Sequence, residues 1–141
     1  MSTLAKIFIF AILSQTFSNA QEPNLKSITV KIQNLSSNQG MVYVALYNAE
    51  ATFLGKGIQS SKTMVSNKSC EVVFKNLPEG VYAVSFFHDE NGNGKLDTNF
   101  MGIPKETYGC SNNAQGFMGP PKWSDAKFEM SNENIEQTIT L

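Results

Sequence analysis

The segment HDENGNGKLD, residues 88–97, places oxygen-bearing groups at alternate positions around two glycines. Calcium is a hard cation that binds about six to eight oxygens, so a tightly wound loop that aims alternate oxygens at one point suits it. Gly94 falls at the sixth position of the calcium-loop pattern, where the chain must turn sharply. The groups predicted to bind the ion lie at positions one, three, five, seven and nine: Asp89, Asn91, Asn93, the backbone carbonyl of Lys95, and Asp97.

The pattern fails at its twelfth position, where Phe100 replaces the bidentate glutamate of helix–loop–helix sites. Glu90, Asn99, Glu106 or water would then have to complete the shell of oxygens. With two or three carboxylates we expect weak calcium affinity, about 10⁻⁴–10⁻³ M. A second interpretation stays open. Asn-Gly pairs after a strand are typical of a polar hairpin turn, since both residues tolerate positive φ and Asp and Asn side chains bond to their own backbone.

A long segment without alternation, residues 95–125, is rich in Gly, Asn and Pro but also in aromatic and aliphatic residues. It is too apolar for disorder, so we expect an ordered loop packed over one end of the domain. Aromatic rings beside amides suit sugars or peptides, which makes four residues candidate ligand-binding groups: Tyr108, Asn112, Asn113 and Trp123. The alternative is that the aromatic rings only cap the core.

The sequence evidence for a catalytic site is weaker than the evidence for an ion or ligand site. His88 could act as base for a Cys110 thiol beside an aspartate, but nothing in the spacing brings them together. The alternative role for His88 is a hydrogen bond to loop backbone. Carboxylate pairs for glycoside hydrolysis could be drawn from Asp89, Glu90, Asp97 and Glu106. Turn acids are commonly solvated, so we expect no enzymatic activity.

Period-two alternation of apolar and polar residues dominates the chain and predicts strands. The predicted strands are 27–33, 40–48, 69–77, 80–88, 126–130 and 135–141, with another around 57–65 and a helical turn within 49–55. Strands that each have one apolar face bury it best as two packed sheets. The sequence therefore predicts an all-β, antiparallel β-sandwich of about seven strands with one long ordered loop. A closed barrel is the alternative.

The first 20 residues have the features of a secretory signal: Lys6, a short apolar run, and small residues before a cleavage site after Ala20. The apolar run is too short to span about 30 Å of hydrocarbon, which takes about 20 residues. We therefore expect a cleaved signal peptide at 1–20 and a single domain at 21–141, located in the periplasm or secreted. No later segment is apolar enough to cross a membrane.

The composition excludes some partners. The formal net charge is −1 and the chain has no arginine, which argues against nucleic acid and leaves no polybasic patch for anionic lipid. Cys70 and Cys110 are the only cysteines. In an exported protein they could pair, or they could be two separate buried thiols.

One long motif resembles a known family. The run NLPEGVYAVSFFHDENGNGKLDTNFMGIPKETYGCSNNA, with GMVYVALYN before it and GPPKW after it, resembles the bacterial exported family called domain of unknown function 2141. The resemblance implies a small extracytoplasmic β-sandwich and no established activity. The LPEGVY stretch is more distantly similar to prealbumin-like and carboxypeptidase-regulatory-like sandwiches, which implies an Ig-like or prealbumin-like arrangement; some domains of that group carry an Asp- and Asn-rich calcium loop.

Together these features predict an exported, non-enzymatic accessory or structural domain of the bacterial cell envelope, stabilised by calcium in the 89–97 loop. The alternative is an extracytoplasmic binding module that holds a carbohydrate or peptide with its 98–124 loop. The expected partner is an envelope protein or glycan, and the domain is expected to be a monomer.

Overall fold

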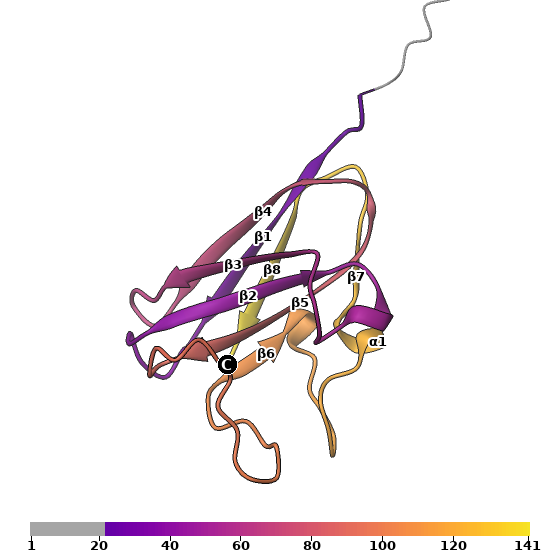
Figure 1. The fold of residues 1–141 in the computed structure, drawn as a ribbon. Helices are drawn as coiled ribbons and strands as arrows, with labels where there is room; N and C mark the ends of the chain where they lie inside the picture. Colours follow the sequence, from indigo (N-terminus) through magenta and orange to yellow (C-terminus); the bar gives the residue numbers. More distant parts are fainter. Residues whose placement is uncertain (1–21) are drawn as a thin grey trace, which may run out of the picture.

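The computed structural model describes residues 22–141, which form two packed β-sheets (Figure 1). The predicted signal peptide at 1–20 lies outside the described residues. The smaller sheet has the strand order β4 (Cys70–Leu77), β1 (Lys26–Gln33), β8 (Ile135–Thr140). The larger sheet has the order β3 (Gln59–Met64), β2 (Met41–Tyr47), β5 (Gly80–Asp89), β6 (Tyr108–Cys110), and β7 (Phe128–Met130) also pairs with β5. The predicted all-β sandwich is confirmed, with eight strands.

One strand pair differs from the antiparallel prediction. β1 and β8 run parallel, with Ile28 opposite Ile135 and Gln33 opposite Thr140. Parallel neighbours require a crossover connection rather than a tight hairpin. The chain provides one because β7 belongs with β5 in the other sheet, and the turn after it carries the chain across to β1. The other strand pairs in the two sheets are antiparallel.

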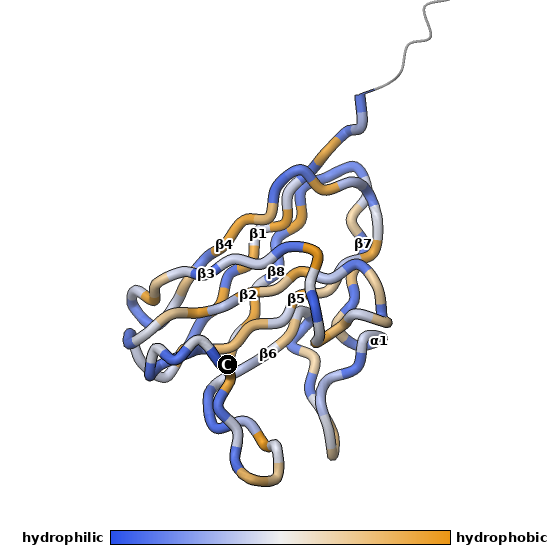
Figure 2. Tube along the Cα trace, in the orientation of Figure 1, coloured by the Kyte–Doolittle hydropathy of each residue, from blue (hydrophilic) through white to orange (hydrophobic). Residues whose placement is uncertain are grey.

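The core lies between the two sheets and is formed by the apolar positions that alternate along the strands (Figure 2). Inward-facing residues from β1, β2, β4 and β5 are almost fully buried, as the alternation predicts: Ile28, Val30, Ile32, Val42, Val44, Leu46, Val72, Phe74, Tyr82, Val84 and Phe86. Leu141 ends the predicted strand 135–141, but it lies one residue beyond β8 and is 44% exposed.

The outer face of β5 has a second, smaller cluster. Ala83, Cys110, Ala114 and Ala126 pack there, with Phe53 and Trp123 against them. Ala126 was predicted to begin a strand. It instead ends the short helix α1 (Trp123–Ala126), and the strand starts at Phe128. The predicted helical turn near residue 50 is the 3-10 turn η1 (Glu50–Thr52). Within residues 22–141, no helix has the length and apolar character that crossing a membrane requires.

The long segment between β5 and β7 is ordered, as predicted, but it is not a simple cover. It contributes β6 to the edge of the larger sheet, followed by the 3-10 turn η2 (Ser111–Asn113). Two parts of it extend away from the sheets at the same end of the domain (Figure 1). Their apolar residues were expected to pack on the core, but Phe100, Met101, Ile103, Phe117 and Met118 are exposed.

Ser111 fastens this segment to the sheet. Its side chain is fully buried, and its Oγ accepts a hydrogen bond from Val84 N–H at 2.9 Å and donates to the Ala126 carbonyl. One hydroxyl therefore ties β5, η2 and the end of α1 together.

Replacement of Ser111 by alanine should lower the free energy of unfolding by about 1–3 kcal/mol, since it leaves buried backbone groups without a partner. Denaturant unfolding measures the change. Ser124→Ala is the matched control, because Ser124 is exposed and its hydroxyl donates a long hydrogen bond to the neighbouring Asp125 carboxylate. Equal stability of the two variants would contradict this role for Ser111.

Candidate functional site

The carboxylate of Asp89 organises the loop that follows β5. Asp89 is 1% exposed, and its Oδ1 accepts hydrogen bonds from the N–H groups of Gly92 and Asn93 at 3.0 and 3.2 Å. Its Oδ2 accepts a third from Gly94 N–H at 2.8 Å. Gly92 and Gly94 have φ of 73° and 74°, a region in which residues with a side chain are strained. The two glycines let the backbone wind tightly around one buried carboxylate.

Asp97 closes the loop from the other end. The side-chain amides of Asn91 and Asn93 donate to its two carboxylate oxygens, the second at 2.7 Å. Hydrogen bonds from Asn93 and Asn91, in that order, lower the pKa of Asp97 below its ordinary value of 3.8. The amide oxygens accept backbone N–H groups two residues further on: Asn93 N–H for Asn91, and Lys95 N–H for Asn93.

Four of the five predicted calcium-binding residues are thus brought together by their side chains: Asp89, Asn91, Asn93 and Asp97. Lys95 continues the same turn through its backbone. The atoms that these residues could offer to a metal ion are all oxygens, which suits a hard cation rather than zinc. Among residues 22–141, no three His, Cys, Asp or Glu side chains form a metal-binding group. Any ion would therefore depend on asparagine and backbone oxygens beside the carboxylates.

Glu106 adds an unusual carboxylate to this loop. Its Oε2 accepts Asp97 N–H at 3.1 Å, whereas its Oε1 is buried and has no hydrogen-bond partner. An unpaired buried oxygen is costly unless a cation or water satisfies it. Glu106, Asp97 and Glu90 line one cleft beside the loop. The oxygen-only donor set and this orphan oxygen both fit calcium.

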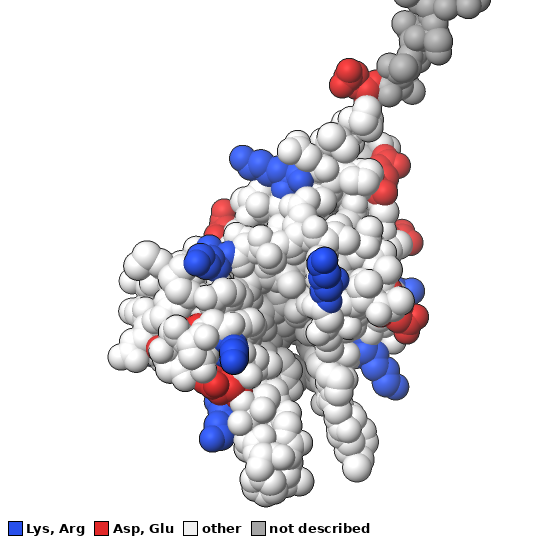
Figure 3. All heavy atoms as spheres, in the orientation of Figure 1, with Lys and Arg blue, Asp and Glu red and all other residues white. Residues whose placement is uncertain are grey.

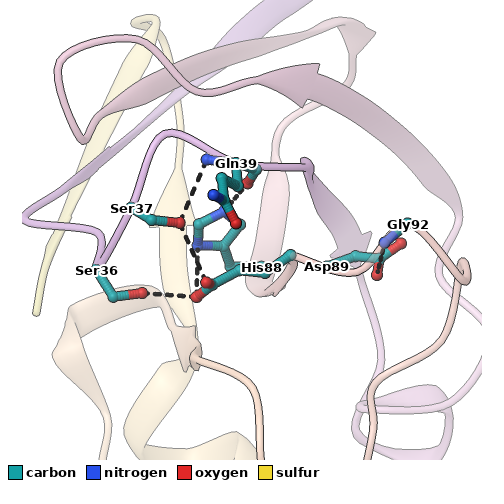
Figure 4. Close-up of polar contacts among 7 residues, drawn as sticks. Ser36, Ser37, Gln39, His88, Asp89 and Gly92 are labelled. Carbon is teal, nitrogen blue, oxygen red and sulfur yellow. Dashed lines mark hydrogen bonds and ion pairs between the residues drawn. The ribbon is translucent and has the colours of Figure 1, made fainter.

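A second set of contacts fixes the loop to the connection between β1 and β2 (Figure 4). Glu90 accepts hydrogen bonds from Ser36 Oγ at 2.7 Å and Ser37 Oγ at 3.1 Å. The Ser36 contact lowers the pKa of Glu90 most, and Ser37 and the nearby His88 lower it further. Gly40 makes this approach possible, because a Cβ there would collide with the backbone of Asp89.

His88 is fully buried beneath these contacts. Its Nε2 lies 2.6 Å from the Gln39 carbonyl, so Nε2 carries the proton and donates. Its Nδ1 has no hydrogen-bond partner and lies 3.7 Å from Glu90 Oε1. The histidine therefore bonds to loop backbone, as its non-catalytic interpretation predicts.

The thiol nucleophile that could be drawn from the sequence is not formed. Cys110 packs with Ala83 on the outer face of β5, whereas His88 follows Val84 and Phe86 on the inner face. Cys70 and Cys110 are free thiols in separate clusters, so the disulfide interpretation is wrong for this structure. Burial raises the pKa of both thiols to about 11, which leaves very little thiolate at neutral pH.

The four predicted ligand-binding residues do not converge on one site. The Asn112 amide donates to the carbonyls of Asp125 and Lys127 at 3.1 and 2.8 Å, and so joins η2 to α1. The ring of Trp123 packs edge-on against Phe53 at 5.7 Å. Both residues hold the long segment in place.

The other two predicted residues meet at a cavity. Tyr108 and Asn113 line a space of about 350 Å³ together with the end of β8. Asn113 Oδ1 also accepts Thr140 N–H at 3.0 Å. Ser36, Ser37 and Gln39 were not among the residues predicted from the sequence. Their partners lie about fifty positions away, so no local pattern could have indicated them.

The two lowered carboxylate pKa values predict that the domain loses stability in acid. A carboxylate whose pKa is lowered in the folded state stabilises the fold at pH values above its ordinary pKa, which is 4.5 for Glu90 and 3.8 for Asp97. This stabilisation is lost as the pH falls through the lower pKa of the folded state. The melting temperature should therefore decrease once the pH is lowered below about 4.5. Glu90→Gln should weaken this dependence, whereas Glu133→Gln, in the exposed turn before β8, should not. Indistinguishable pH profiles would contradict the role of Glu90.

A comparison with protein-family models places the chain. The model that matches is described as "Uncharacterized protein conserved in bacteria (DUF2141)" and covers residues 30–138. The match runs from β1 to β8 and includes the whole 89–97 loop. No curated protein and no solved structure matches, so the similarity to prealbumin-like sandwiches stays a prediction. The chain belongs to this uncharacterised bacterial family, DUF2141.

Proposed function

We propose that the protein is an exported, non-enzymatic accessory or structural domain of the bacterial cell envelope, and that its 89–97 loop binds calcium. The observation that carries the calcium proposal is the buried, unpaired Oε1 of Glu106, whose other oxygen contacts the Asp97 backbone. The signal-like N-terminal sequence supports export.

Calcium binding would need a small rearrangement of the loop. The amides of Asn91 and Asn93 now offer N–H groups to Asp97, so they would turn their oxygens inward. Asp89 would keep its three backbone hydrogen bonds, because its Oδ2 accepts only one of them and has a lone pair left for the ion. The loop is already wound, and binding therefore orders few groups.

The consequence of binding would be mechanical. Asp97 and Glu106 are the two ends of the first protruding hairpin, since Lys105 N–H donates to the Asp97 carbonyl at 2.7 Å. A cation shared by the loop and Glu106 would fix the base of this hairpin on β5. Structural stiffening needs no substrate and no reacting group, which is why the proposed role is accessory rather than catalytic.

Calcium titration of the mature chain, residues 21–141, tests the proposal. For a dissociation constant of about 10⁻³ M, calcium at ten times that concentration should stabilise the fold by about 1.4 kcal/mol. The melting temperature should rise in calcium relative to a chelator, and less in magnesium, which demands a smaller, octahedral site.

Two variants locate the effect. Asp97→Asn and Glu106→Gln should each lose most of the calcium response. Glu129→Gln is the control, because it removes the same charge from an exposed position on β7. An unchanged melting temperature in calcium, or a full response in both site variants, would rule the proposal out.

The second candidate is a binding module, and the cavity beside β8 favours it. Tyr108 and Asn113 offer one ring and one amide there, which suits a short glycan or peptide. A ligand found in a glycan or peptide screen should no longer bind to Tyr108→Ala. It should still bind to Trp123→Phe, since Trp123 packs against Phe53 and is not part of the cavity lining. Retention in Tyr108→Ala would exclude the cavity as the site.

A further inference from the structure

The two protruding parts of the long segment carry the most exposed apolar residues described. We call residues 98–104 and 115–121 the two apolar tips. Phe100 is 97% exposed in the first, and Phe117 and Met118 are 90% and 95% exposed in the second. Both tips extend from the same end of the domain (Figure 1), and in the space-filling view they are two uncharged prongs (Figure 3).

The first tip is a turn that internal hydrogen bonds hold together. The side chain of Asn99 accepts the N–H groups of Met101 and Ile103 at 2.9 and 3.0 Å. Gly102 N–H donates to the Asn99 carbonyl at 3.0 Å, and Asn99 N–H donates to the Ile103 carbonyl at 2.8 Å. Four of its backbone N–H groups are thus satisfied within the turn, and the apolar side chains, including that of Phe100, are exposed.

The second tip is also a tight turn, and it contains two glycines and two prolines. Gly116 and Gly119 approach so closely that a Cβ on Gly116 would collide with the Gly119 carbonyl. Met118 adopts a φ of 52°, which completes the tight turn. The next two residues, Pro120 and Pro121, have no backbone N–H to satisfy. The turn therefore leaves the side chains of Phe117 and Met118 exposed.

Charge is arranged around the tips. Residues 98–104 and 111–121 contain no charged side chain. Lys105 follows the first tip directly, and Lys122 follows the second. Lysine side chains at such positions can extend their amines toward lipid phosphates while the apolar stem lies along the tip. Asp97 and Glu106 lie at the base of the first tip, held by the contacts already described.

We propose that the two apolar tips insert into the interface of a lipid bilayer that carries anionic headgroups. The interface of a bilayer is hydrated, so backbone groups of the tips can keep their contact with water while the exposed side chains of Phe100, Phe117 and Met118 enter the boundary between headgroups and acyl chains. A stable protein partner needs about 1,000 Å² of complementary surface, which five side chains on two separate convex prongs do not offer. A bilayer requires no matching pockets. The two lysines complement the anionic phosphates.

This proposal does not depend on calcium binding. The apolar tips supply most of the attraction, and the two lysines add to it. Binding should therefore weaken only moderately as salt increases, in contrast to binding through a polybasic patch.

Vesicle flotation of the mature chain, residues 21–141, tests the proposal, with vesicles of phosphatidylethanolamine and phosphatidylglycerol in a chelator and again in calcium. The wild type should float with these vesicles, and Phe100→Ser with Phe117→Ser should lower the partition coefficient at least about tenfold. Met64→Ser is the control: Met64 is 74% exposed on β3, outside both tips, and should leave flotation unchanged. Lys105→Ala and Lys122→Ala should each weaken binding up to about fivefold.

Depth of insertion gives a second readout. Phe100→Trp should show blue-shifted fluorescence and quenching by brominated lipid chains, which the wild-type Trp123 should not show. Because the tips are exposed, the melting temperatures of the tip variants should match the wild type.

Three results would overturn the proposal. In the first, the wild type floats neither in chelator nor in calcium. In the second, the double tip variant floats to the same extent as the wild type. The third is a tip-dependent dimer in sedimentation velocity without vesicles, which would assign the tips to a second copy of the chain.

Discussion

The buried carboxylate of Asp89 is the group on which the structure of the candidate site depends. It stands at the last position of β5 and accepts three backbone N–H groups from the turn that follows. A buried charge is tolerated only when it is well hydrogen-bonded, so the turn must wind around it. The position of Asp97, and through it of Glu106 and the first apolar tip, follows from that winding.

The same end of β5 is held from the other side by a separate group of contacts. Ser36 and Ser37 bind Glu90, and Gln39 binds His88, so the connection between β1 and β2 is fixed to the start of the 89–97 loop. Because β1 and β2 belong to different sheets, these contacts also join the two layers at this rim. The first apolar tip follows directly from this rim, whereas the second lies between η2 and α1.

Local pattern was sufficient for most of the fold. Alternation identified the strands and their buried faces, and the Asp-x-Asn-x-Asn-Gly spacing identified the residues that converge at the loop. The parallel partner of β1 was not predictable, because alternation gives the face of a strand but neither its neighbour nor its direction. β6 was missed because three residues beginning Tyr108-Gly109 show no period that could be recognised.

The amide side chains show the same limit at the level of single residues. Asn112 and Asn93 look alike in the sequence, yet Asn112 binds backbone carbonyls near α1 while Asn93 contacts Asp97. Only tertiary contacts distinguish an asparagine that joins two elements from one that lines a candidate ion site. The exposed Phe100 and Phe117 were expected to pack on the core for a related reason, since composition cannot tell a covering loop from a protruding one.

Terbium luminescence tests most directly whether the loop gathers its oxygens around a cation. Terbium prefers oxygen ligands as calcium does, and the Tyr43 hydroxyl lies close to Gly94, where excitation of its ring can sensitise a bound ion. The wild type should show sensitised emission that calcium displaces, that Tyr43→Phe reduces, and that Asp97→Asn abolishes. Absence of sensitised emission from the wild type, or emission unchanged in Asp97→Asn, would contradict cation binding by this loop.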